Sequence, residues 1–163
     1  MKKIILILLT FLSLNIRSQQ VNDSTSQQVK RNVGVVLGTE AALYAGSMSG
    51  LYFLWYAGYE QSAFHFYNDN AEWLQMDKFG HAMSSYYVGT LGYEALRLAG
   101  CGEKRSIIYG GPVGFVFLTT VEIFDGLSSG WGFSWGDIAA NAIGTGLFMT
   151  QQALWHEQRI SMK

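Results

Sequence analysis

Three short polar groups interrupt a stretch of apolar, glycine-rich sequence between Trp73 and Phe148. They contribute carboxylates, one amide, one lysine and one histidine, at Asp77, Lys78, His81, Glu122, Asp125, Asp137 and Asn141. Carboxylates and an imidazole are suitable ligands for a divalent metal ion. Crowded carboxylates also raise one another's pKa values, which suits general acid–base catalysis. A third interpretation is a structural network in which Lys78 neutralises an acid and Asp137 caps a helix.

Helical spacing groups these residues in pairs. The members of each pair are three or four residues apart and so share one helix face: Asp77 with His81, Glu122 with Asp125, and Asp137 with Asn141. The first pair begins a predicted helix over residues 77–98, the second ends one over 106–124, and the third begins one after Ser134. In antiparallel helices these positions lie at the same end of a bundle. The predicted catalytic core is therefore Asp77, His81, Glu122 and Asp125, with Lys78, Asp137 and Asn141 beside it. Its cofactor and any metal stay open.

Local signals fix where the later helices begin. Ser134-x-x-Asp137 resembles a capping box, and Phe133 and Ile138 are placed as a hydrophobic staple. This helix-start chemistry explains Asp137 without any catalytic role. Gly110-Gly111-Pro112 predicts either the first turn of the third helix or a kink in it.

The segment from Val33 to Ala57 is the most membrane-like part of the sequence after the first 32 residues. Its length is about that of a bilayer span. Gly34-x-x-x-Gly38 and Gly46-x-x-x-Gly50 predict close approach by another helix. Glu40 interrupts the segment and is expected to face the interior of a bundle. Aromatic residues typical of a membrane boundary follow, at Tyr52, Trp55, Tyr56 and Tyr59.

Composition agrees with helices that pack in or at a membrane. Of the 163 residues, 49% are hydrophobic and only 14% charged, below the roughly 25% of ordinary soluble domains. We predict an all-α protein, a four-helix antiparallel bundle that is membrane-embedded or membrane-associated, with one domain over residues 33–157 and a tail over 158–163. The single cysteine, Cys101, excludes an internal disulfide.

The N-terminus has the pattern of a bacterial signal peptide. Met1-Lys2-Lys3 precedes an apolar run from Ile4 to Leu14. We expect a signal peptide over residues 1–18, either cleaved or kept as an anchor, and a polar linker over 19–32. Without residues 1–18 the chain has a net charge of −4, with 8 basic and 12 acidic residues. It has no basic stripe, so no nucleic-acid partner is expected.

The polar groups also carry a resemblance to known families. The matching residues are Asp77-Lys78-x-x-His81, Glu122-x-x-Asp125-Gly126 and Gly132-Phe133-Ser134-x-x-Asp137-x-x-x-Asn141-x-x-Gly144. This ordered set resembles the YfiM-like family of bacterial envelope proteins, which are described as lipoproteins. A fainter similarity is to VanZ-like membrane proteins, linked to glycopeptide resistance. The resemblance implies an envelope location. No cysteine lies in residues 15–32, directly after the apolar run, which departs from the lipoprotein pattern.

These observations predict a bacterial cell-envelope protein whose helical core carries an acidic and histidine cluster for binding or scaffolding. One alternative is a metal-dependent hydrolase that acts on an envelope lipid or cell-wall precursor. Another is a subunit of a larger envelope complex. The expected partners are membrane lipid and an envelope protein. The inner membrane is the favoured location, with the periplasmic or outer-membrane face as the alternative.

Overall fold

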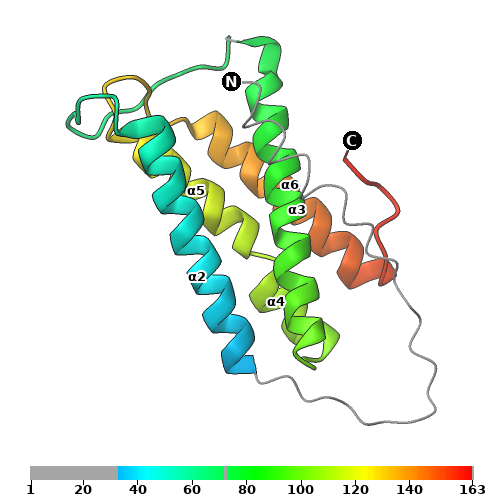
Figure 1. Ribbon diagram of the computed structural model, residues 1–163. Helices are drawn as coiled ribbons and strands as arrows, with labels where there is room; N and C mark the ends of the chain where they lie inside the picture. Colours follow the sequence, from blue (N-terminus) through cyan, green and yellow to red (C-terminus); the bar gives the residue numbers. More distant parts are fainter. Residues whose placement is uncertain (1–32, 72, 163) are drawn as a thin grey trace, which may run out of the picture.

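The computed structural model describes residues 33–71 and 73–162 (Figure 1). Its elements are α2 (Val33–Leu51), η1 (Tyr52–Tyr56), η2 (Trp73–Gln75), α3 (Met76–Leu98), α4 (Glu103–Gly110), α5 (Val113–Gly126) and α6 (Trp135–Trp155). The described residues form isolated bridges but no strand. The predicted mostly helical chain with four helices is confirmed, since α4 and α5 together make up the third. The predicted signal peptide and linker lie outside the described residues.

A kink separates α4 from α5 at the glycine and proline that the sequence singled out. Pro112 lacks a backbone N–H and therefore cannot continue the hydrogen-bond ladder of α4. It stands immediately before α5, a position that proline tolerates. The third predicted helix is thus two shorter ones. A short connecting segment joins the two helices, which follow one another across the molecule (Figure 1).

Helix α3 is the central element. It packs on α4, α5 and α6. Helices α2 and α5 run in one direction, and α3 and α6 run in the opposite one (Figure 1). Glycine makes the closest approaches possible. A Cβ atom at Gly92 would lie 2.5 Å from the carbonyl oxygen of Gly110, so any larger residue would push α3 and α4 apart. Tyr86, Tyr93 and Phe148 form the buried core, in which both tyrosine rings meet the Phe148 ring edge to face.

The segment after α6 folds back on the helices. The Tyr86 hydroxyl donates to Gln158 Oε1 at 3.1 Å, and the Tyr87 hydroxyl donates to the Met162 carbonyl at 2.6 Å. Gln151 on α6 donates to the carbonyl of Ile160 at 2.9 Å. These contacts tie the last described residues to both α3 and α6.

Helix α2 packs much less than the others. Met48 is its one buried residue, and Val35 and Leu43 are more than 60% exposed. The prediction that its glycines let another helix approach is wrong for the described chain, in which a Cβ at Gly38, Gly46 or Gly50 would meet nothing within 4 Å. Its contacts with the rest are few, among them the Tyr44 hydroxyl against Thr120 Oγ1 at 2.5 Å.

One helical run of the described residues, Glu103–Gly126, is long and apolar enough to cross a membrane, with a mean hydropathy of 1.6. Core helices can share that length and composition. Helix α2, which the sequence analysis ranked as the most membrane-like segment, does not meet the same criterion. Its Gly, Ser and Thr residues together with Glu40 lower its mean hydropathy.

Candidate functional site

The predicted site residues come together at one end of the helices. The start of α3, the end of α5 and the start of α6 meet there, as antiparallel helices require. All seven residues singled out by the sequence take part: Asp77, Lys78, His81, Glu122, Asp125, Asp137 and Asn141. Their proximity is a feature of the structure, whereas a catalytic role for Asp77, His81, Glu122 and Asp125 stays a prediction.

His81 lies between an amide and two carboxylates. Its Nδ1 is 3.1 Å from Asn141 Oδ1 on α6. Its Nε2 is 3.5 Å from Glu122 Oε1 and 3.8 Å from Asp77 Oδ1. The Asn141 contact holds the ring at one nitrogen, so the other nitrogen faces the acids.

Lys78 is the basic centre of the cluster. Its Nζ is 2.8 Å from Asp137 Oδ1, 2.5 Å from Asp69 Oδ2 and 3.6 Å from Asp77 Oδ2. Burial would lower the pKa of Lys78, but hydrogen bonds to Asp137 and Asp69 outweigh burial and raise it. Burial would likewise raise the pKa of Asp69, but hydrogen bonds from Lys78 and Ser134 hold it below its usual range. The lysine therefore stays charged between two carboxylates.

In contrast to Asp69, two acids on α5 have raised pKa values, which favour their neutral forms. Glu122 is 1% exposed, and burial raises its pKa to about 8 although Oε2 accepts the Ser134 N–H at 3.0 Å. Burial also raises the pKa of Asp125 to about 6, although it accepts a hydrogen bond from the Tyr56 hydroxyl at 2.7 Å. The neutral form of Glu122 therefore persists to near-neutral pH, which lets this carboxyl group donate or accept a proton.

Local structure explains how α6 positions Asp137 and Asn141 in the cluster. Ser134 Oγ accepts the Asp137 N–H at 3.3 Å, which confirms the predicted helix start. A Cβ at Gly144 would overlap the Ala82 carbonyl and Ser85 Oγ, so glycine is needed where α6 crosses α3. Ser85 Oγ donates to the Asn141 carbonyl at 3.0 Å and ties the two helices at that crossing. The Asn-x-x-Gly motif therefore sets the position of the Asn141 amide against His81.

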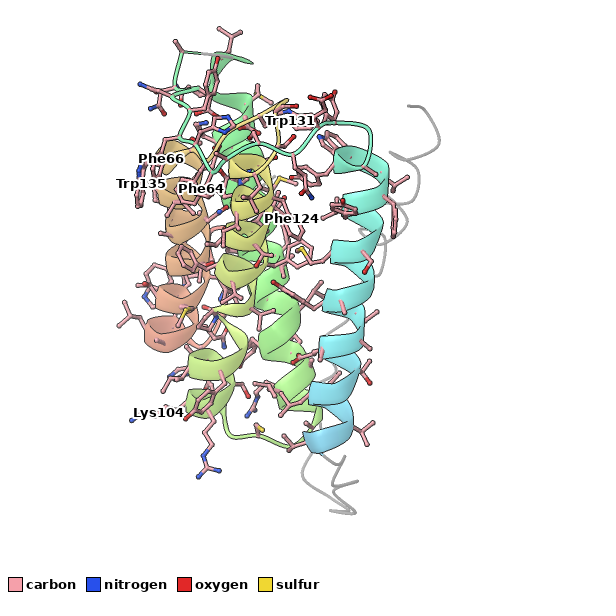
Figure 2. The ribbon with its side chains drawn as sticks, turned by 90° about the vertical axis from the view of Figure 1, so that its left-hand side faces the viewer. Phe64, Phe66, Lys104, Phe124, Trp131 and Trp135 are labelled. Atoms are coloured by element: carbon pink, nitrogen blue, oxygen red, sulfur yellow. The ribbon has the colours of Figure 1, made fainter. Side chains whose placement is uncertain are left out.

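Two loops cover this end of the molecule. Residues 57–71 run beside residues 126–133 and share backbone hydrogen bonds such as Phe133 N–H to the His65 carbonyl at 3.0 Å. Aromatic rings lie over them, and Phe66 stacks on Trp135 with a centroid separation of 6.1 Å and an interplanar angle of 9° (Figure 2). A Cβ at Gly126 would meet the Phe64 ring at 2.5 Å. The glycine after Asp125 in the sequence motif is thus a packing requirement of this cover.

Sequence reasoning missed some members of the cluster. Asp69 pairs with Lys78 and accepts a hydrogen bond from Ser134 Oγ at 2.7 Å, yet it lies in a polar loop with no helical spacing to the others. The sequence places Tyr56 only in an aromatic group at a membrane boundary and does not indicate its hydrogen bond to Asp125. The one available signal for Asp69 was its place in the run Asn68-Asp69-Asn70 shortly before α3. Asp137 does more than begin a helix, since it is 3% exposed and ion-paired with Lys78.

Part of the cluster has the donor set of a metal centre. One ligand atom from each of Asp77, His81 and Asp137 lies within 4.8 Å of the others. A single imidazole nitrogen with carboxylate oxygens is a suitable set for zinc and related divalent ions. The same acids also form ion pairs with Lys78, so their placement has a structural role as well.

Comparison with protein families identifies residues 65–152 with a family described as "Predicted periplasmic lipoprotein (DUF2279)". The chain belongs to this family. All seven predicted site residues fall inside the matched region. The result agrees with an uncharacterised family of envelope lipoproteins, while the YfiM-like and VanZ-like resemblances stay predictions. Searches of curated proteins and of solved structures give no match.

Proposed function

We propose that this envelope protein is a membrane-associated helical bundle whose cluster binds a cationic ligand at one end. The observation that carries the binding function is an imbalance of charge. Five carboxyl groups gather around one lysine and one histidine: Asp69, Asp77, Glu122, Asp125 and Asp137. A purely structural network would be expected to pair its buried charges. An excess of acids instead leaves a place for a further cation.

Lys78 does not satisfy this excess, because it is shared between Asp69 and Asp137. Nor does any other lysine or arginine form an ion pair within the cluster among the described residues. Asp77, with half of its side chain exposed, gives the cluster an opening to solvent. A ligand from outside can therefore reach the acids without unfolding the helices.

Membrane association is supported by the distribution of charge along the helices. The sequence has no Asp, Glu, Lys, Arg or His between His81 and Glu94, between Arg105 and Glu122, or between Asp137 and His156. Large apolar side chains on these stretches, the uncharged zone, are exposed at Leu91, Val116 and Ile143. Val35 and Leu43 on α2 are exposed too, although Glu40 lies between them. Exposed apolar area of this extent marks a lipid or protein contact.

Aromatic and basic side chains mark the two ends of the uncharged zone. Trp131, Phe66 and Trp135 lie at the end with the cluster, and Lys104 lies at the opposite end (Figure 2). Amphipathic aromatic rings favour the level of lipid headgroups. We therefore propose that lipid covers the apolar helix faces and leaves the cluster in the aqueous boundary, with the inner membrane as the host.

The test of binding is thermal unfolding of the full chain in mild detergent, after chelation and dialysis. We expect at least one cation from a panel of Zn²⁺, Mn²⁺, Mg²⁺, Ca²⁺ and spermidine to raise the midpoint in a concentration-dependent way, because a ligand that binds only the folded state stabilises it. If none does, the cluster is structural. Membrane attachment is tested separately by fractionation, carbonate extraction and protease accessibility; release of the chain by carbonate contradicts it.

A second candidate is a metal-dependent hydrolase of an envelope lipid or cell-wall precursor. The observation that favours it is the position of Glu122, which is buried 3.5 Å from His81 and beside the possible metal ligands. A carboxyl group there could move a proton to or from a metal-bound water. Release of phosphate from isoprenoid pyrophosphate by the wild type, but not by Glu122→Gln, would support it.

A subunit role in a larger envelope complex is the remaining alternative. The open face of α2 could contact another protein in place of lipid, since its apolar side chains are exposed. Crosslinking in intact membranes distinguishes the two. A defined heteromeric adduct through α2 supports the complex, and a lone monomer supports contact with lipid.

A further inference from the structure

The geometry points to a divalent transition-metal site formed by Asp77, His81 and Asp137. This inference rests on the proposed binding function of the cluster and names its ligand. The potential ligand atoms lie within 4.8 Å of one another, a separation that a shared ion can bridge. Asp77 and His81 share a face of α3, while Asp137 comes from the first turn of α6.

The buried amide of Asn141 is the first independent observation. Asn141 is 0% exposed, and its Oδ1 is 3.1 Å from His81 Nδ1, so the amide points into the cluster. Its Nδ2 has no hydrogen-bond partner among the described residues. Buried donors are rarely left without an acceptor. A water or hydroxide carried by an ion at the neighbouring acids would supply one.

The tautomer of His81 is the second observation. If Asn141 Oδ1 is an acceptor, Nδ1 of His81 carries the proton and its Nε2 has a free lone pair. Metal-bound histidines commonly donate their other N–H to such an oxygen, which orients the ring. The arrangement of His81 and Asn141 is therefore that of a ligand with its supporting partner.

The surroundings of Nε2 give a third reason. This nitrogen faces Glu122 Oε1 at 3.5 Å and Asp77 Oδ1 at 3.8 Å. With Nδ1 protonated, the lone pair of Nε2 faces carboxyl oxygens of both Asp77 and Glu122. A cation is attracted by all three atoms and, where Glu122 is ionised, relieves their mutual repulsion. Since imidazole nitrogen suits zinc, copper, iron and nickel, whereas calcium and magnesium prefer oxygen ligands, the ion belongs to the first transition row.

The ion would take its place beside Lys78 without displacing it. Lys78 Nζ contacts Asp137 through Oδ1 and is 3.6 Å from Asp77 Oδ2. The Asp77 oxygen nearest to His81 is the other one, Oδ1. The lysine and the metal thus use different oxygens of Asp77, and both positive charges offset the five acids.

The experiment uses the tag-free full chain, purified in detergent, stripped with a chelator and dialysed against Zn²⁺ or Co²⁺. We expect one ion per chain by elemental analysis, and visible Co²⁺ absorption typical of nitrogen and oxygen ligands. Asp77→Asn and His81→Asn should each weaken binding at least tenfold, as loss of a ligand does. Glu94→Gln, an acid at the other end of α3, should leave binding unchanged. Circular dichroism verifies that each variant is folded.

Several outcomes overturn the inference. They are the absence of stoichiometric Zn²⁺ or Co²⁺, equal retention of the ion by Asp77→Asn and His81→Asn, or nitrogen NMR showing that both ring nitrogens of His81 stay protonated in the presence of Zn²⁺. If Ca²⁺, Mg²⁺ or spermidine alone raises the unfolding midpoint, the cluster binds a cation but not at this centre, so the proposed function stands. If no cation has any effect, both fail.

Discussion

Helices α2 and α6 both carry small residues at four-residue spacing, yet only α6 uses them for close packing. On α6, Gly144 lies so near α3 that a Cβ would overlap the Ala82 carbonyl. On α2, Gly46 and Gly50 face open space within the described chain. Spacing of small residues therefore shows that a helix can be approached, and not that it is. What selects α6 is the polar contact at the crossing, where Ser85 Oγ donates to the Asn141 carbonyl.

The largest expected difference is between α2 and the charged cluster, in which Lys78 of α3 pairs with Asp137 of α6. Lys78→Met should reduce the free energy of unfolding by about 3–5 kcal/mol at pH 7, because it leaves buried carboxylates without their cation. Since the pKa of Asp69 is lowered in the folded state, its share of that stability is present at pH 7 and is lost as pH falls. Chemical denaturation at pH 7 and pH 4 measures the effect.

Glu40→Gln on α2 is the matched control for Lys78→Met. Glu40 has a buried oxygen without a hydrogen-bond partner among the described residues. Its replacement by a neutral amide should change stability by less than about 0.5 kcal/mol. Similar losses in the two variants would show that α2 is as integral to the fold as the cluster.

The glycines offer a second comparison, smaller in size. Gly144→Ala should destabilise the chain by about 1–3 kcal/mol through overpacking at the α3–α6 crossing. Gly46→Ala should be neutral or stabilising by up to about 1 kcal/mol, because alanine favours helix and meets no neighbour. Thermal unfolding in detergent separates the two. A loss at Gly46 would mean that the face is occupied, by another copy or by a partner.

The pH dependence of stability isolates Glu122. Its pKa rises from an ordinary value of 4.5 to about 8 on folding, so between these values the folded state binds more protons than the unfolded state. Stability should therefore fall as pH rises through this window. The full shift of about 3.5 pKa units corresponds to about 5 kcal/mol, at roughly 1.4 kcal/mol per unit. Glu122→Gln should flatten the profile measured by denaturation from pH 5 to pH 8. A profile unchanged by the substitution would place the titration elsewhere.

A smaller effect is expected for the hydroxyl of Tyr56, which η1 contributes to the cluster. Tyr56→Phe removes the donor to Asp125 Oδ1 and should reduce stability by about 1 kcal/mol. It should also raise the pKa of Asp125 further, since this hydrogen bond lowers it. Tyr52→Phe, on an exposed ring of the same turn, is the control and should change neither the stability nor the pKa of Asp125. Carbon NMR of the Asp125 carboxyl group measures the pKa.

The sequence was sufficient for the parts of the site that follow helical spacing. Asp77 with His81, Glu122 with Asp125, and Asp137 with Asn141 are local pairs, so a period of 3.6 residues predicts their shared faces. Short turns then place the three helix ends together. Asp69 and Tyr56 could not be found in this way, because Asp69 enters from a loop and Tyr56 from the end of η1, and no periodicity relates them to α3.

The sequence by itself determined the helices, a helix start or kink at Gly110-Gly111-Pro112, the start of α6 at Ser134 and the polar character of one end, because these depend on neighbours a few residues apart. Only the tertiary structure decided which helix faces touch. It brought α6 against α3 through Gly144, left α2 at the edge, and set Asn141 beside His81. The physical reason is that helix contact depends on the fit of two surfaces far apart in the chain, whereas the period of one helix describes only its own.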